Sequence, residues 1–428
     1  MAHHALKSDY HSLVRRLNKF PQGAPPSDLL FQILKMLFSE KEAHLVALLP
    51  IVPFSIADAA RAWKIPQAQA RKILDQLADR ALLLDGEQDG RMTYTLPPPM
   101  AGFFEFSLMR VREDLDQKTL SELYYQYVTV EEDFIKDLFA RGETQLGRVF
   151  VHEPALSPEH SLYVLDYERA SQVIQSASHR AVGMCYCRHK MAHLDKACQA
   201  PMNICMTFNH CGEVLARHGF AREIDRAECM DLLQSAYDHQ LVQFGENVRE
   251  RVSFICNCCG CCCEAMLAAQ RFGILHPVHT TNFLPLLAPD RCTGCGRCVS
   301  ACPVQAWSLV PVQDSRHPQK KQARLDETIC LGCGVCVRAC TQAALSLRSR
   351  PQRVITPLDS VHRAVMMAIE RGTLQHLIFS QQAFASHRAM AAILGVILKL
   401  PPIKQALASR QFKSRYLEKL IQRTRYGA

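Results

Sequence analysis

The sequence predicts a mixed α+β protein that is mainly helical and is divided into several domains. Its 428 residues exceed the length of one typical domain, and a hydrophobic share of 48% suits folded cores. Apolar residues recur at helical spacing in the N-terminal third, and twenty cysteines gather in short stretches farther along. We expect four parts: residues 1–100, 101–279, 280–350 and 351–428.

The first part, residues 1–100, has the element order helix, helix, helix, helix and hairpin. Helices are expected over residues 26–38 and 40–50, and a third helix begins after Ser55, which suits its N-cap. Pro66 suits the first turn of the fourth helix, and LLLDGEQDGRMTYTLP then predicts a hairpin with a glycine-containing turn. This order resembles a winged-helix domain.

The charges of this domain argue against DNA binding. The candidate recognition helix, Gln67 to Leu82, carries acidic as well as basic side chains, and the hairpin tip carries Asp85, Glu87 and Asp89. A wing that approaches phosphates does not favour three acids. We therefore expect packing or partner docking rather than contact with nucleic acid, and a redox-sensing winged-helix regulator is only our second alternative.

Two short motifs carry the strongest chemical signal. Residues 292–303 read CTGCGRCVSACP and residues 330–341 read CLGCGVCVRACT, each with the spacing Cys-x2-Cys-x2-Cys-x3-Cys. Bacterial two-cluster proteins use this spacing, and the fourth cysteine of each motif ligates the other cluster. One [4Fe–4S] cluster would be held by Cys292, Cys295, Cys298 and Cys340. The second would be held by Cys330, Cys333, Cys336 and Cys302.

Over residues 280–350 the sequence resembles the dicluster ferredoxin family, which implies a βαββαβ-like fold and single-electron transfer. The polar stretch between the motifs predicts a hairpin, with strands near Trp307 to Val312 and Ala323 to Asp326. One departure is Thr341, where the family usually has proline. We expect it to relax the turn after Cys340 and to leave ligation intact.

Twelve further cysteines lie in the middle part, residues 101–279, which we expect to be helical. Ten of them fall in MCYCRHKMAHLDKACQAPMNICM, residues 184–206, and in CNCCGCCC, residues 256–263, and the other two are Cys211 and Cys229. Four thiolates are the number that a cubane cluster needs. The candidates for one additional centre are Cys185, Cys187, Cys198 and Cys205, with Cys256 and Cys259 as the first choices from the second stretch.

Three interpretations of these middle cysteines stay open. The first is an additional iron–sulfur cluster, and the second is structural zinc, which is commonly held by four cysteines. The third is a redox-active thiol site, in which Arg188 and Lys190 would favour thiolate. The same two cations also suit a cluster, because they offset its negative charge.

From about residue 97 to 350 the chain resembles multidomain 4Fe–4S binding proteins of anaerobic bacteria. The matching stretches are PPPMAGFFEFSLMR, VLDYERA, CYCRHKMAHL, FICNCCGCC and the two cluster motifs. The resemblance implies electron transfer in anaerobic metabolism and supplies no defined reaction.

These observations predict an iron–sulfur electron-transfer protein. It would pass single electrons through two [4Fe–4S] clusters and a third centre in the middle part, to or from a partner redox enzyme. The alternative is an oxidoreductase whose active site is formed by the middle cysteines and is fed by the ferredoxin module. We expect a carrier or an oxidoreductase subunit rather than a stand-alone enzyme, and the sequence identifies no catalytic residue.

The sequence shows no feature of an exported or membrane-spanning protein, and its C-terminal tail is basic. No early segment has the order of a signal peptide, and the apolar run Ala389 to Leu398 is too short to span a bilayer. We therefore expect a cytoplasmic protein whose cysteines are ligands rather than disulfides. The net charge is +9, with much of the excess after residue 347. We expect the basic tail, residues 351–428, to be helical. It would pack on the protein's own core, dock onto an acidic partner protein or lie on a membrane surface.

Overall fold

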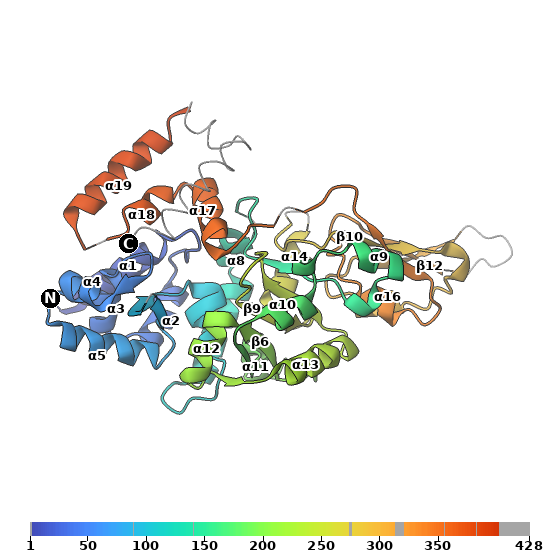
Figure 1. The fold of residues 1–428 in the computed structure, drawn as a ribbon, viewed down its shortest axis with the longest axis horizontal. Helices are drawn as coiled ribbons and strands as arrows, with labels where there is room; N and C mark the ends of the chain where they lie inside the picture. Colours follow the sequence, from blue (N-terminus) through green and yellow to red (C-terminus); the bar gives the residue numbers. More distant parts are fainter. Residues whose placement is uncertain are drawn as a thin grey trace. The chain divides into compact units, whose positions relative to one another are not determined.

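The computed structural model describes residues 2–88, 90–139, 141–273, 276–312, 321–354, 356–381 and 383–401. The chain divides into two compact units (Figure 1). Unit 1 comprises Met1–Thr144, Arg217–Phe220 and Leu358–Ala428, and unit 2 comprises Gln145–Ala216 and Ala221–Pro357. Most of the basic stretch of the tail, residues 402–428, lies outside the described residues, and so do the helices expected there.

Unit 1 begins with helices whose apolar faces follow the predicted spacing. These helices are α1 (Ala2–Leu17), α2 (Asp28–Leu37) and α3 (Glu40–Ala47). Helix α2 begins after Ser27, whose side chain accepts a hydrogen bond from the backbone of Leu30. Its buried residues, Leu30, Ile33, Leu34 and Leu37, form one face at helical spacing.

A three-stranded sheet with two helices follows in unit 1. Its elements are β1 (Phe54–Ser55), α4 (Ile56–Trp63), α5 (Gln67–Ala78), β2 (Leu84–Gln88) and β3 (Arg91–Thr95). Ser55 caps α4 by accepting from the backbone of Asp58, and Pro66 stands at the N-cap of α5. The sheet order is β1-β3-β2, with antiparallel pairs. These elements occupy the stretch for which a winged helix is predicted.

The remainder of unit 1 is helical. Its elements are η1 (Pro99–Phe103), α6 (Phe104–Phe106), α7 (Gln117–Tyr124), η2 (Tyr125–Val130), α8 (Glu132–Phe139), α17 (Ser360–Arg371), α18 (Leu374–Ile378) and α19 (Ala385–Leu398). The buried guanidinium of Arg371 joins distant segments, since it donates to the carbonyl oxygens of Pro21 and Asp137 at 2.7 Å each. Across the described residues, no helix is both long and apolar enough to cross a membrane.

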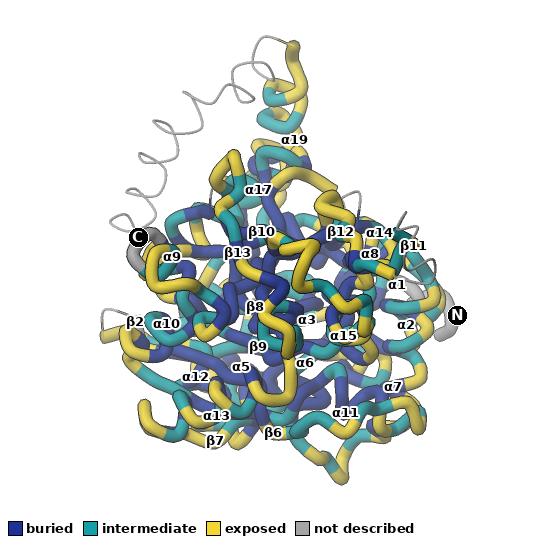
Figure 2. Tube along the Cα trace, turned by 90° about the vertical axis from the view of Figure 1, so that its right-hand side faces the viewer, coloured by how far each residue is buried: buried dark blue, intermediate teal, exposed yellow. Residues whose placement is uncertain are grey.

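Unit 2 is built on a six-stranded antiparallel sheet in the order β4-β8-β9-β6-β5-β7. Its strands are β4 (Gly147–Val149), β5 (Arg180–Met184), β6 (Asn203–Phe208), β7 (Ala221–Glu223), β8 (Val242–Glu246) and β9 (Phe254–Cys258). The helical middle part expected from the sequence is therefore wrong for residues 147–258. All five residues of β8 are buried, and they include the polar side chains of Gln243 and Glu246 (Figure 2). The stretch VQFG does alternate apolar residues with Gln and Gly, a short strand signal that sequence reasoning missed.

Helices connect and cover these strands. They are η3 (Glu153–Ala155), α9 (Pro158–Tyr163), η4 (Asp166–Glu168), α10 (Ala170–Ser176), α11 (Tyr186–Ala192), α12 (Asn209–Arg217), α13 (Arg226–Asp238) and α14 (Glu264–Phe272). Helices α10 and α13 share one core with the sheet, in which Ile174 and Leu233 pack with Met206 and Ile255. Cys229 is fully buried in this core, where it acts as a small apolar side chain.

The C-terminal part of unit 2 contains the two cysteine motifs. Its elements are β10 (Phe283–Leu287), η6 (Pro289–Arg291), α15 (Arg297–Ala301), β11 (Trp307–Pro311), β12 (Lys321–Leu325), α16 (Val335–Ala339) and β13 (Leu345–Ser349). Strand β10 pairs with β13, and β11 pairs with β12 as the hairpin predicted between the motifs. Each motif begins in a loop and continues into a short helix, α15 in the first motif and α16 in the second, so loop and helix together orient its cysteines.

Candidate functional site

The eight cysteines of the two motifs line two separate pockets of unit 2. The first pocket is lined by Cys292, Cys295, Cys298 and Cys340. The second is lined by Cys302, Cys330, Cys333 and Cys336. Each pocket therefore takes three cysteines from one motif and the fourth from the other, the crossed grouping that two-cluster proteins use.

Glycines and backbone N–H groups shape these two pockets. Gly332 has a φ of +70°, and a Cβ there would lie 2.1 Å from the carbonyl oxygen of Phe283, so only glycine fits the turn. The N–H of Gly332 donates to the sulfur of Cys330 at 3.4 Å, and the N–H of Ala306 donates to Cys302 at 3.2 Å. Such donors stabilise negative charge on cluster-ligating sulfur.

The two pockets differ in their exposure to solvent. Cys295 in the first pocket is exposed, and the backbone N–H of Arg297 lowers the pKa of its thiol. In the second pocket, burial raises the pKa of Cys330 to about 11. Burial also raises the pKa of Cys336, and the indole N–H of Trp307 opposes this by donating to its sulfur. Exposure and hydrogen bonds to sulfur both tune cluster potentials, so the two pockets offer different environments.

Ten of the twelve middle cysteines form two groups rather than one. The first, here called the loop group, consists of Cys198, Cys259, Cys261 and Cys262, and all four sulfurs lie within 4.8 Å of one another. The sulfurs of Cys198 and Cys259 are 3.6 Å apart, as are those of Cys261 and Cys262. The segment between β9 and α14 supplies three members, and the segment before β6 supplies Cys198.

The second group, here called the strand group, consists of Cys185, Cys187, Cys205, Cys256, Cys258 and Cys263. Its sulfurs make pairwise contacts: Cys205 touches both Cys185 and Cys256, and Cys263 touches both Cys187 and Cys258. The last of these pairs, Cys258 and Cys263, is 3.1 Å apart.

The sheet and two helix starts position the strand group. Cys256 and Cys258 are two residues apart on β9, so they share one face of the strand. Strand β6 pairs with β9 so that Met206 faces Ile255, and one step further this register brings Cys205 opposite Cys256. Cys185 and Cys263 stand at the N-caps of α11 and α14.

The six candidate ligands from the sequence are thus divided between the two groups. Cys198 and Cys259 belong to the loop group, and the other four belong to the strand group. Sequence reasoning missed four further members, namely Cys258, Cys261, Cys262 and Cys263. Recognition of β9 as a strand would have indicated Cys258, because alternate residues of a strand share a face.

Two buried cations of α11 lie beside these thiols. Arg188 is 1% exposed, and its Nε lies 3.4 Å from the sulfur of Cys198 while its Nη2 lies 3.8 Å from that of Cys259. Lys190 is fully buried and pairs with the buried carboxylate of Glu264. Its burial lowers its pKa to about 8, against the opposing effect of thiolates that include Cys187 and Cys263.

The loop group favours thiolate at Cys259. A hydrogen bond from Cys262 and the charge of Arg188 lower the pKa of Cys259 to about 4, against the opposing effect of burial. Burial lowers the pKa of Arg188, but the thiolates of Cys185, Cys198 and Cys259 raise it above its usual value. Thiolate, not thiol, is the metal ligand, so these electrostatics suit metal binding.

The loop group lies against the second motif. A Cβ on Gly260 would lie 2.6 Å from the carbonyl oxygen of Pro303, the residue after Cys302. The side-chain amide of Gln270 donates to the carbonyl oxygens of both Gly260 and Pro303, at 2.6 and 2.8 Å. The cysteine-rich loop and the second pocket are therefore directly connected within unit 2.

His152 forms another connection to the second pocket. Its backbone N–H donates to the carbonyl oxygen of Cys333 at 2.8 Å, and its Nε2 lies 2.8 Å from the carbonyl oxygen of Leu241. Burial lowers the pKa of His152 to about 4, so the imidazole is neutral near pH 7. This residue fixes the loop at Cys333 against the segment that precedes β8.

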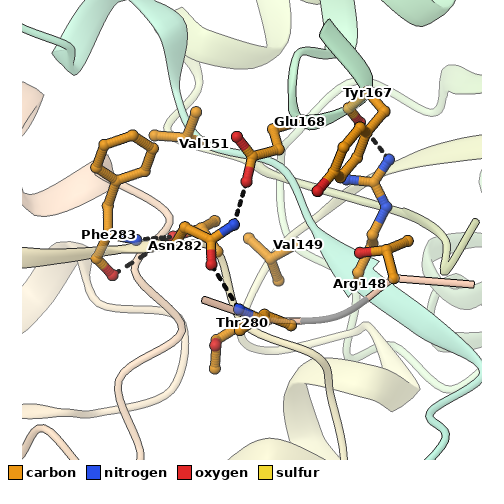
Figure 3. A pocket seen from close by; sticks show the side chains of 11 residues that line it. Arg148, Val149, Val151, Tyr167, Glu168, Thr280, Asn282 and Phe283 are labelled. Carbon is orange, nitrogen blue, oxygen red and sulfur yellow. Dashed lines mark hydrogen bonds between the residues drawn. The ribbon is translucent and has the colours of Figure 1, made fainter. Parts of the chain in front are cut away.

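A pocket without cysteines also occurs in unit 2 (Figure 3). Its cavity of about 10 Å³ has room for about one water molecule. The side chain of Asn282 donates to the carboxylate of Glu168, and Arg148 donates to the carbonyl oxygen of Tyr167 (Figure 3). The network ties η4 to Asn282, the residue before β10, and the cavity is too small for an organic substrate.

One comparison with known proteins supports the grouping of the motif cysteines into two cluster sites. A family model of the 4Fe–4S dicluster domain matches residues 291–344, a range that includes all eight cysteines of the two motifs. The comparison with curated proteins and the comparison with solved structures each gave no match. The match confirms a 4Fe–4S dicluster domain within the predicted range 280–350.

Proposed function

We propose that this iron–sulfur protein transfers single electrons through three centres of unit 2. Two are [4Fe–4S] clusters of the dicluster domain, and the third is an iron–sulfur centre in the strand group. The ligands of the first cluster are Cys292, Cys295, Cys298 and Cys340. The ligands of the second are Cys302, Cys330, Cys333 and Cys336. When bound, such clusters supply one-electron redox chemistry.

The chain's own residues support the two dicluster sites. Three cysteines of each motif converge with the fourth of the other on one pocket. Backbone N–H groups such as that of Ala306 point at sulfur, and the buried indole of Trp307 limits water near Cys336. The residues therefore hold the thiolates, stabilise their charge and exclude solvent.

The strand group supports the third centre. Four of its six cysteines are buried, and they lie on neighbouring strands and at helix starts. Their sulfurs form two sets in contact, Cys185, Cys205 and Cys256 in one and Cys187, Cys258 and Cys263 in the other. The sets lie close enough for Cys205 and Cys256 to act on the charge of Cys258, so a cluster can take thiolates from both sets and bind them to different irons. The charge of Lys190 lies close enough to act on Cys187 and Cys263, and so offsets the negative charge of a thiolate-ligated cluster.

The observation that carries the proposal is the contact between Gly260 and Pro303. It joins the loop that runs from Cys258 to Cys263, two members of the strand group, to the residue that follows Cys302, so the strand group and the second pocket are connected through this loop. Electrons exchanged with a partner at the exposed first pocket would then reach the strand group through the second pocket.

A carrier or an oxidoreductase subunit fits better than a stand-alone enzyme. The pocket drawn in Figure 3 has room for about one water molecule, so it offers no substrate site. An oxidoreductase with its active site at the middle cysteines stays the alternative. It predicts that one substrate class, such as a disulfide, reoxidises the reduced protein.

Partner binding is proposed for unit 1. In its β2–β3 hairpin, Asp85 is 8% exposed and is held by Arg217 and His218 at 2.9 Å each. A hairpin whose acidic side chain is held by ion pairs within the protein suits a docking or structural role rather than contact with phosphates.

Helix α19 exposes Ile393 at 55% and Val396 at 66%, which suits a redox-enzyme partner or a peripheral membrane contact. A cytoplasmic location remains part of the proposal.

The test is the number of reducible centres in protein purified without oxygen. Wild type should carry iron and labile sulfide beyond the about eight irons of two cubanes. A Cys205→Ser/Cys256→Ser variant should lose the excess and one electron paramagnetic resonance (EPR) signal, and keep the two dicluster signals. A Cys211→Ser variant is the control. Wild-type protein with no reducible cluster signal would exclude electron transfer.

A further inference from the structure

The loop group has the dimensions of a site for one metal ion. Four sulfurs at about 2.3 Å from one tetrahedral zinc ion are about 3.8 Å apart. The sulfurs of Cys198 and Cys259 are 3.6 Å apart, those of Cys261 and Cys262 are 3.6 Å apart, and all four lie within 4.8 Å of one another. The side chains therefore need only small adjustments to surround a single ion.

The same compactness argues against a cubane cluster at this place. In a [4Fe–4S] cluster each thiolate binds a different iron, so the four sulfurs stand around the whole cubane and lie farther apart than sulfurs that share one ion. The loop from Cys259 to Cys262 also supplies three of the four ligands within four residues. Tetrahedral sites with four sulfurs and a closed coordination shell are typical of structural zinc.

Arg188 supplies the charge that such a site requires. A divalent ion with four thiolates carries a net charge of −2, and Arg188 places its guanidinium 3.4 Å from Cys198 and 3.8 Å from Cys259. Its other contacts are the carbonyl oxygens of Pro201 and Asn257. A guanidinium that is 1% exposed needs an anionic partner, which neutral thiols do not provide.

We propose that Cys198, Cys259, Cys261 and Cys262 hold a single tetrahedral divalent ion, Zn²⁺ or Fe²⁺, separate from every iron–sulfur cluster of the chain. The ion crosslinks the segment before β6 to the loop after β9. It thereby fixes Gly260 against Pro303 and orders the loop between the strand group and the second pocket. The ion has a structural role, and the proposal does not depend on a third iron–sulfur centre.

The experiment measures zinc, iron and labile sulfide per chain in full-length protein purified without oxygen. The variants are Cys261→Ser, at the exposed member of the group, and Cys198→Ser, with Cys211→Ser in α12 as the matched control. Besides the iron and sulfide of the clusters, wild type and control should each carry one zinc ion, or one extra iron atom that has no matching sulfide. Both loop-group variants should lose that one ion and keep the cluster iron and sulfide.

A second readout identifies the geometry independently of folding losses. Wild-type protein produced with Co²⁺ in place of zinc should show the visible d–d bands and sulfur-to-cobalt charge-transfer bands of a tetrahedral thiolate site. Cys261→Ser should change their energy and intensity, and the control should not.

The outcomes separate this proposal from the electron-transfer function. A loss of about four irons with about four sulfides in Cys261→Ser would show that the loop group ligates a cluster, and the proposal would be overturned. Metal content that is equal in wild type and both variants would overturn it as well. The EPR signals of the reduced clusters are recorded on the same samples, so failure of the electron-transfer proposal would be visible separately.

Discussion

Gly260 lies directly against Pro303, with no space for a side chain between the two backbones. The first residue stands in the middle of the loop that carries Cys259 and Cys261, and the second follows Cys302. Gln270 holds both carbonyl oxygens with one amide group, which fixes the pair. The contact therefore fixes the distance between the loop that carries Cys259 and Cys261 and the segment that follows Cys302.

The first prediction concerns this contact. A Gly260→Ala substitution places a methyl group 2.6 Å from a backbone oxygen that cannot rotate away, so the loop must move. We expect a loss of about 1–3 kcal/mol in unfolding free energy and a weaker magnetic interaction between reduced centres. Denaturant unfolding and EPR measure the two effects. Gly395→Ala is the control, because its Cβ meets only ordinary contacts at 3.5 Å; equal effects of both substitutions would contradict the prediction.

The second prediction concerns the turn at the second pocket. Gly332→Ala introduces a Cβ that would lie 2.1 Å from the carbonyl oxygen of Phe283, at a φ of +70°. We expect loss of the second cluster, measured as a decrease of about four irons per chain. Gly372 has a φ of +69° with open space around it, so Gly372→Ala should cost only about 1 kcal/mol. Retention of all iron in Gly332→Ala would contradict the close approach.

The third prediction concerns the potential of the second cluster. Trp307→Phe removes the N–H that donates to the sulfur of Cys336. The reduced cluster carries more negative charge than the oxidised one, so loss of the donor should lower the potential. A hydrogen bond worth about 1 kcal/mol corresponds to roughly 40 mV for one electron. A redox titration followed by EPR measures the change, with Trp63→Phe as the control in unit 1. A potential that stays constant or rises would argue against this hydrogen bond.

The fourth prediction concerns Arg188. Arg188→Met removes the buried positive charge beside Cys198 and Cys259 and leaves their thiolates without a partner. We expect the unfolding free energy to fall by about 3 kcal/mol and Co²⁺ bound at the loop group to be extracted more readily by a chelator. Arg188→Lys keeps the positive charge, so it should retain part of the unfolding free energy and part of the resistance of Co²⁺ to the chelator. The exposed pair of Arg222 with Glu228 offers the control Arg222→Met, which should change neither quantity measurably.

The fifth prediction concerns pH and the stability of unit 1. Burial raises the pKa of Asp85, but hydrogen bonds from His218 and Arg217 lower it to about 2. The bond to Asp85 in turn raises the pKa of His218 above 6.5. The contribution of Asp85 is present above its ordinary pKa of 3.8 and is lost as the pH falls through about 2. That of His218 is present below 6.5 and is lost as the pH rises through its raised pKa.

The pair therefore stabilises unit 1 most between about pH 4 and pH 6.5. Asp85→Asn should cost more unfolding free energy at about pH 5 than at about pH 9, because His218 is charged only at the lower pH. Thermal unfolding at the two pH values measures the difference. Asp79→Asn, at a more exposed partner of His218, should have a smaller effect. An equal cost of Asp85→Asn at both pH values would exclude the charged pair.

The spacing of cysteines within each motif determined the grouping seen in the dicluster domain. Ligands that lie two or three residues apart can reach only one small volume, so Cys292, Cys295 and Cys298 had to converge whatever the rest of the chain did. The periodicity of Leu30, Ile33, Leu34 and Leu37 determined the buried face of α2 in the same local way. Both inferences needed no knowledge of distant contacts.

Only the tertiary structure decided how the middle cysteines are divided. Cys198 and Cys259 are 61 residues apart in the chain, yet their sulfurs are 3.6 Å apart because β6 and β9 are neighbours in the sheet. Strand β8 offers only a short alternation, VQFG, which is easily missed beside the helices around it. With the sheet unrecognised, local spacing did not indicate that Cys258 points with Cys256 into the strand group while Cys259, one residue later, belongs to the loop group. Local spacing fixes ligands that are close in sequence, whereas strand pairing fixes those that are not.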